Sequence, residues 1–132
     1  MTIHNLGGKT TAFQLQSCAT ISATAAGQVG GAAAFVDTQQ YGGDIVLTLD
    51  HAAAGSGVTL TAKIQESDAS GSGYTDVTGG AFTAAAANTA SFATLTLAGD
   101  ILKRSLRVQF TVSGGSGTGA ASVIGRGSTQ YL

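Results

Sequence analysis

The sequence predicts an all-β protein: a single antiparallel β-sandwich, jelly-roll-like, of about seven or eight strands, with an extended N-terminal arm. Apolar residues recur at every second position along most of the 132-residue chain, which is the period of a half-buried strand. Short Gly/Ser segments separate these stretches, and the chain has 20 glycines and no proline. We assign residues 1–12 to the arm and residues 13–132 to one β-sandwich domain.

The arm shows no clear apolar period. It contains a Gly7-Gly8 pair, and Ile3 and Leu6 are its large apolar residues. An extended segment of this kind can add a strand to the edge of a neighbouring sheet. We therefore expect Ile3 and Leu6 to bind a partner and the arm to be ordered by that partner.

Six segments carry the strand period in the remaining chain. They are FQLQSCATISAT (13–24), DIVLTLD (44–50), GVTLTAKIQE (57–66), SFATLTL (91–97), SLRVQFTV (105–112) and the weaker AASVIGR (120–126). In the second of them Ile45, Leu47 and Leu49 share one face. Alternation of apolar and polar faces is typical of antiparallel sheets that have one solvated side.

Turn signals lie between the strands at the spacing expected of a sandwich or barrel. They are AAGQVGGAAA (25–34), AAAGSG (52–57), ASGSG (69–73), TGGAF (78–82), AGD (98–100) and SGGSGTG (113–119). The alanine-rich segment 81–90 has high helix propensity but no amphipathic stripe, so we interpret it as a connection.

The stretch QESDASGSGYTDV (65–77) raises the question of a metal site. Asp68, Ser70, Ser72, Gly73 and Asp76 fall at the first, third, fifth, sixth and ninth positions of a calcium loop. Such a loop needs a glutamate at the twelfth position and flanking helices, whereas this chain has a glycine there and strands on both sides. Ser, Gly and Asp also form tight turns, and we predict a turn without calcium.

Other candidate sites have simpler interpretations. GGSGTGA (114–120) lacks the lysine of a phosphate-binding loop and opens no helix. Cys18 is interpreted as a small apolar filler rather than a nucleophile, and His4 and His51 as surface residues. No nucleophile and base pair emerges around the neighbouring Asp50 and His51, so we predict no enzyme activity and no cofactor.

Charge restricts the class of partner. The net charge is −1 and 10% of residues are charged. This balance lacks the excess of basic residues that binds nucleic acid or a membrane surface. No signal peptide or spanning apolar run is visible, and we expect the chain to fold in the cytoplasm where it is made.

Half of the six basic residues lie in KRSLR (103–107): Lys103, Arg104 and Arg107. This cluster is either a contact for a carboxylate-rich partner, which arginine binds through two hydrogen bonds, or a solvated strand start. We expect the five phenylalanines to lie in the core. The tyrosines Tyr41, Tyr74 and Tyr131, near loops or the chain end, are expected to serve an interface.

Residues 44–132 resemble a group of small tailed-bacteriophage virion proteins. The matching segments are LTAKIQESDASGSGYTDVTGGAF (60–82) and LKRSLRVQFTVSGGSGTGAASVIGRG (102–127). They hold framework residues rather than a catalytic signature, and Leu106 departs from the aromatic residue common there. The resemblance implies a head decoration (cement) protein that binds the major capsid protein from outside, or a neck or tail component.

A free-standing binding module, for example for carbohydrate, is the alternative from another class. The expected oligomer is a homotrimer on the capsid surface. Few charges, small outward side chains and the absence of edge prolines leave strand edges unprotected, and capsid lattices offer three-fold positions at which identical patches repeat.

Overall fold

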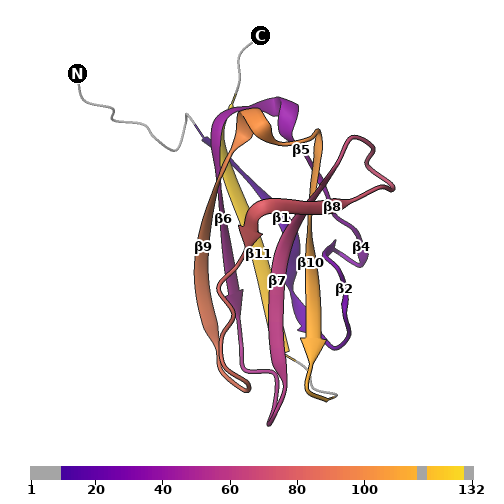
Figure 1. Ribbon diagram of the computed structural model, residues 1–132, viewed down its shortest axis with the longest axis vertical. Helices are drawn as coiled ribbons and strands as arrows, with labels where there is room; N and C mark the ends of the chain where they lie inside the picture. Colours follow the sequence, from indigo (N-terminus) through magenta and orange to yellow (C-terminus); the bar gives the residue numbers. More distant parts are fainter. Residues whose placement is uncertain (1–9, 116–118, 130–132) are drawn as a thin grey trace, which may run out of the picture.

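Two antiparallel sheets lie face to face in the computed structural model (Figure 1), which describes residues 10–115 and 119–129. The long strands are β1 (Thr10–Ile21), β6 (Tyr41–His51), β7 (Thr59–Ser67), β8 (Thr75–Ala81), β9 (Ser91–Ala98), β10 (Ser105–Ser113) and β11 (Gly119–Thr129). Short strands are β2 (Ala25–Ala26), β3 (Gln28–Val29), β4 (Ala32–Ala33) and β5 (Val36–Asp37). The described residues form no α-helix, only the 3₁₀ turns η1 (Thr38–Gln40) and η2 (Gly99–Ile101).

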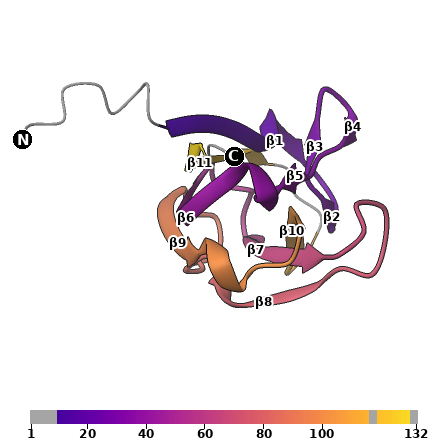
Figure 2. The same ribbon diagram turned by 90° about the horizontal axis from the view of Figure 1, so that it is seen from above.

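The strand order is that of a jelly roll. One sheet has the order β1-β11-β6-β9, and the other has the order β2-β10-β7-β8, with β5 also pairing with β10. The chain passes from one sheet to the other at most connections, and the β7–β8 hairpin stays within one sheet. Figure 2 shows the two layers from above. The predicted antiparallel, jelly-roll-like sandwich is confirmed.

The core lies between the sheets, where the inward faces of their central strands meet. Ile45 and Leu47 on β6 and Ile64 on β7 are fully buried, as are Val108 and Phe110 on β10. The period-two pattern predicted these faces, because successive side chains of a strand point to opposite sides. All six segments expected to be strands are strands.

Strand β1 differs from its expected range and its expected alternation. It begins at Thr10, so the last three residues of the expected arm pair with β11, and residues 1–9 lie outside the described residues. Two register shifts, between Gln14 and Gln16 and between Gln16 and Ala19, break the alternation. Leu15 and the neighbouring Gln16 are both buried, since a bulge turns neighbouring side chains out of phase, and Cys18, interpreted as a small apolar filler, is exposed.

Two expected turns contain strand structure. The segment TGGAF (78–82) was predicted as a turn, but residues 78–81 belong to β8, where Gly79 has φ +75° beside a register shift. A bulge of this kind keeps a glycine with positive φ inside a ladder. Segment 25–34 holds β2 and the β3–β4 hairpin, whose turn residues Gly30 and Gly31 have φ of +62° and +82°, as a primed turn requires.

The burial of three further side chains is the opposite of the prediction. His51 is buried, with Nδ1 3.0 Å from the carbonyl oxygen of Ala52, although a surface position was expected. Phe35 and Phe92 are exposed, although a core position was expected. Phe92 pairs with the exposed Asp50 on the outer face of its sheet, so the alternation that buries Ala93 in part turns Phe92 outward.

Candidate interaction surface

The basic segment 103–107 leads from η2 into β10, and its backbone is hydrogen-bonded to two other elements. The amide of Lys103 donates a hydrogen bond to Glu66 Oε2 at 3.0 Å. The buried Thr38 hydroxyl donates to the carbonyl oxygens of Lys103 and Arg104, at 2.9 and 3.1 Å. These contacts hold the start of β10 against η1 and β7, so its side chains project from a rigid base.

The three basic side chains diverge. Arg104 forms an ion pair with Asp37, with Nε 3.4 Å from Oδ2. Arg107 lies over the ring of Tyr74, 4.2 Å from its centroid, and its Nε donates to Gln65 at 3.0 Å. The Lys103 ammonium makes no hydrogen bond or ion pair with the residues that the structure describes. The three basic residues therefore share one segment of the chain but do not form a single cationic patch.

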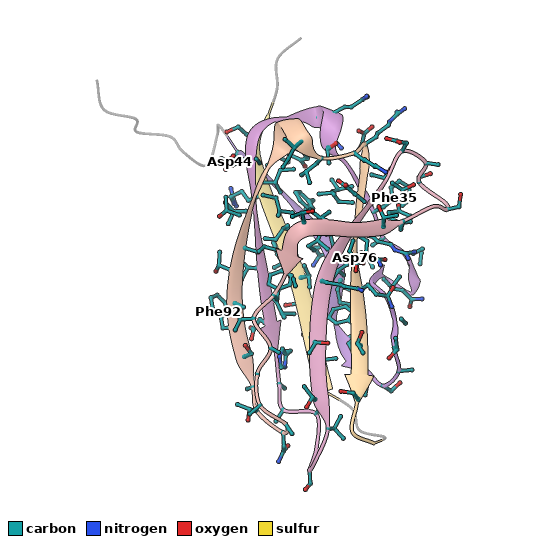
Figure 3. All side chains as sticks on the ribbon, in the orientation of Figure 1. Phe35, Asp44, Asp76 and Phe92 are labelled. Atoms are coloured by element: carbon teal, nitrogen blue, oxygen red, sulfur yellow. The ribbon has the colours of Figure 1, made fainter. Side chains whose placement is uncertain are left out.

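Phe35 lies between two hollows that the arginines border. One hollow, of about 430 Å³, is lined by Phe35, Asp37, Ser70 and Arg104 among others. The other, of about 200 Å³, is lined by Phe35, Ser70, Tyr74 and Arg107 among others. Figure 3 shows Phe35 beside the β7–β8 loop. We call Phe35, Asp37, Tyr74, Arg104 and Arg107 the Phe35 surface.

The sequence contains a signal for the exposure of Phe35 that the expectation of a core position overlooked. Phe35 and Val36 are consecutive, and two neighbouring residues of an extended chain cannot both face the core. Val36 takes the core position with 6% of its surface exposed, and Phe35 is 49% exposed. Exposed aromatic residues next to arginines are typical of the residues that dominate binding energy at interfaces.

The polar loop before β8 has the conformation of a turn between strands, as predicted. The Ser67 hydroxyl donates to the carbonyl of Ser72 at 2.5 Å and accepts from the amide of Ala69 at 3.1 Å. The Tyr74 hydroxyl donates to the carbonyl of Ser70 at 2.8 Å. In residues 10–115 and 119–129 no three His, Cys, Asp or Glu side chains are grouped to hold a metal ion, and the independence from calcium stays a prediction.

Asp76, the acidic residue at the end of this loop, is bound to the neighbouring strand. Its carboxylate accepts hydrogen bonds from Lys63 Nζ and Gln65 Nε2, both at 2.9 Å. These two hydrogen bonds, with that from Lys63 the larger cause, lower the pKa of Asp76 below its ordinary value of 3.8. The carboxylate thus belongs to a network that joins Lys63, Gln65, Arg107 and Tyr74 across the outer face of the five-stranded sheet.

We expect Lys63→Met to raise the pKa of Asp76 towards its ordinary value, because the methionine keeps the length of the side chain and removes the charged donor. Because the pKa of Asp76 is lower in the folded protein than its ordinary value of 3.8, its ionised carboxylate stabilises the fold at a pH above 3.8. This contribution to the free energy of unfolding is lost as the pH falls through the pKa of the folded state. An NMR titration of the Asp76 carboxyl measures this. Lys103→Met is the matched control, and an equal pKa in wild type and Lys63→Met would contradict the prediction.

Tyr41 does not serve the surface, contrary to expectation. Its side chain is buried at the start of β6, with its ring centroid 5.4 Å from that of Phe13. Burial raises the pKa of the Tyr41 phenol. Tyr74 belongs to the Phe35 surface, and Tyr131, like Ile3, Leu6 and His4, lies outside the described residues. No helix among the described residues has the length and apolarity to cross a membrane.

Solved structures with a similar fold include chains of virus particles and a TNF. A chain of T=1 particles derived from infectious bursal virus aligns with a TM-score of 0.51 and 16% identity over 91% of this chain. A chain of the T13 particle of the virus IBDV aligns with a TM-score of 0.52 and 10% identity, also over 91%. The Eiger TNF of S. frugiperda aligns with a TM-score of 0.54 and 13% identity over 93%.

The coverage of the neighbours differs. This chain spans 31% of the length of each viral chain, but 98% of the TNF chain. No protein-family model and no curated protein matches the sequence. At these identities the likeness establishes the jelly-roll fold, and function has to be argued from the surface of this chain.

Proposed function

We propose that this protein is a structural protein of a tailed-bacteriophage virion: a head decoration (cement) protein that binds the major capsid protein on the outer capsid surface and stabilises the head. It acts without catalysis, cofactor, nucleic acid or membrane. It is made in the host cytoplasm and becomes part of the virion. A neck or tail position for the same structural protein is the alternative within this class.

The observation that carries the proposal is the resemblance of residues 44–132 to phage virion proteins, and the jelly roll, which chains of virus particles also have, agrees with it. The surface supports it. Only 10% of the residues are charged, so docking of a sheet face or edge desolvates few charges.

The Phe35 surface is the proposed capsid contact. Phe35 and Tyr74 supply aromatic area, and Arg104 and Arg107 supply donors for carboxylates of the capsid protein. Lys103, whose ammonium has no partner among the described residues, adds a charge at the rim. Ile3 and Leu6 of the N-terminal segment are proposed as a second contact.

The proposed assembly is a homotrimer at a three-fold or quasi-three-fold position of the lattice. Closed cyclic symmetry uses the same patch on each subunit. Three simultaneous contacts raise the overall affinity by multivalency, so that each single contact can be weak.

The test of the function is to mix the purified protein with capsids that lack it and to locate and count bound copies by cryo-electron microscopy. Copies in regular array over the capsid surface support the decoration role. Binding only at the neck or tail selects the alternative, and the absence of binding refutes the virion role.

We expect Phe35→Ala and Arg104→Ala each to weaken capsid binding by about 30-fold, the equivalent of about 2 kcal/mol at a residue that dominates an interface. Val46→Ala is the control, because Val46 is 39% exposed on the outer face of the other sheet. Titration of capsids with labelled protein measures the affinities. Equal affinities for all three variants would contradict this choice of surface.

Carbohydrate binding by a free-standing module is the second candidate, and one observation favours it. Phe35 is an exposed aromatic ring beside hollows lined with Asp37, Asp68 and Ser70, and sugars stack on such rings while polar groups bind their hydroxyls. Screening of the isolated protein against immobilised glycans tests it. Binding that Phe35→Ala abolishes would favour this candidate over the capsid role.

A further inference from the structure

Strand β9 forms an edge of the four-stranded sheet, and no strand among the described residues pairs with its outer side. Its backbone pairs with β6 over Ser91–Ala98, and among the described residues no backbone hydrogen bond joins it to an element on the other side. Figures 1 and 2 both show β9 at the margin of the molecule. A row of free amide and carbonyl groups is a template for another strand.

The other edges of the two large sheets carry devices that disfavour pairing. Strand β1 has two register shifts. Strand β8 has a register shift, Gly79 with φ +75° and the charged Asp76. The fourth edge is divided into β2 and β5, with the β3–β4 hairpin between them. Bulges, charges and very short strands all protect an edge.

Strand β9 has none of these devices. Its eight residues, SFATLTLA, include no charge, proline or glycine, and its register with β6 runs from Asp44↔Ala98 to His51↔Ser91 without a shift. Phe92, Thr94 and Thr96 project from it into solvent, and Phe92 is 72% exposed. An edge strand of this length without protection against pairing indicates that a partner strand covers it in the assembled protein.

The sequence of β9 is complementary to itself in the antiparallel direction. A two-fold axis at Leu95 places Phe92 opposite Ala98 of the second copy, and Thr94 opposite Thr96. The large Phe92 side chain is then opposite the small Ala98, and threonine is opposite threonine, which is a favourable cross-strand pair. No like charges lie opposite each other. Two-fold interfaces of this isologous kind are the commonest in homo-oligomers.

We propose that β9 binds β9 of a second copy of this chain, so that the two four-stranded sheets join into one continuous sheet across a two-fold axis. This contact differs from the Phe35 surface and does not depend on the capsid role. If the trimer proposed above also forms, the β9 contact joins neighbouring trimers on the lattice, where the high local concentration strengthens it.

Thiol cross-linking of the full chain tests the pairing. The background variant is Cys18→Ser, because Cys18 is exposed. In it, Thr96→Cys places two thiols on diagonal neighbours about 7–8 Å apart across the axis, within reach of a short bifunctional maleimide. Thr111→Cys is the control, since Thr111 is equally a strand threonine exposed to solvent, but on β10.

The expected result is a cross-linked dimer that forms several-fold more with Thr96→Cys than with Thr111→Cys. In otherwise wild-type protein, Thr94→Lys is expected to shift the sedimentation of the concentrated protein towards a smaller species, whereas Thr111→Lys leaves it unchanged. Melting curves verify that each variant is folded.

Equal cross-linking at the two positions, or self-association that Thr94→Lys does not alter, would overturn the proposal. Cross-linking of Thr96→Cys to the capsid protein alone would also overturn it, and would assign the edge to that partner. Loss of the dimer on deletion of residues 1–9 would show that the N-terminal segment of a neighbour occupies the edge instead. Apart from cross-linking to the capsid protein, which would itself show capsid contact, these outcomes do not bear on whether the protein binds capsids.

Discussion

Phe110→Ala is expected to lower the free energy of unfolding by about 3–5 kcal/mol, the range for removal of a fully buried phenylalanine. Phe110 is 1% exposed and lies on β10, between Ala62 of β7 and Ala25 of β2. Because the residues opposite Phe110 on both neighbouring strands are small, its ring supplies most of the side-chain volume in this part of the core. The buried Ala62 side chain is too short to fill the cavity that loss of the ring creates.

Urea denaturation followed by far-UV circular dichroism measures the effect. A domain of this size has a total stability of about 5–15 kcal/mol, so the loss is a large part of the whole. Phe92→Ala is the matched control because the same side chain is removed from a site that is 72% exposed, where a change within about 0.5 kcal/mol is expected. Similar losses in the two variants would show that Phe110 is not a core residue.

Gly27→Ala is expected to destabilise the protein by about 1–3 kcal/mol, the cost of overpacking a core site. A Cβ at Gly27 would overlap the carbonyl oxygen of Leu15 and Cγ1 of Val108. The backbone there cannot move away freely, since the Gly27 amide donates to the Val108 carbonyl at 2.8 Å. One methyl group therefore forces β1 away from β10 or breaks this hydrogen bond.

Gly71→Ala provides the control for this substitution. No atom lies within 4 Å of a Cβ at Gly71, and removal of backbone freedom from the unfolded chain is then neutral or slightly stabilising. Thermal melting of both variants checks the pair. Equal melting temperatures would contradict the close approach of β1 and β10 at Gly27.

The sequence alone determined the fold class and the buried faces of the central strands. Strands β6, β7 and β10 follow from a local rule, because side chains of an extended chain alternate between faces and only one face is apolar. The same rule implied that one of Phe35 and Val36 faces solvent. It also located the basic segment 103–107 and the turn before Asp76, whose glycine, serine and aspartate residues have local conformational preferences.

Tertiary structure decided what depends on residues distant along the chain. Arg104 forms an ion pair with Asp37, which lies 67 residues away in the sequence. This contact directs Arg104 away from Arg107 and divides the expected basic cluster. The bulges, beside which both Leu15 and Gln16 are buried, arise from pairing of β1 with β11. The choice of β9 as the open edge depends on the order of all strands in its sheet, because SFATLTLA has the composition of a central strand. Periodicity specifies which face of a strand is buried, but only assembly of the sheets decides which strands are neighbours.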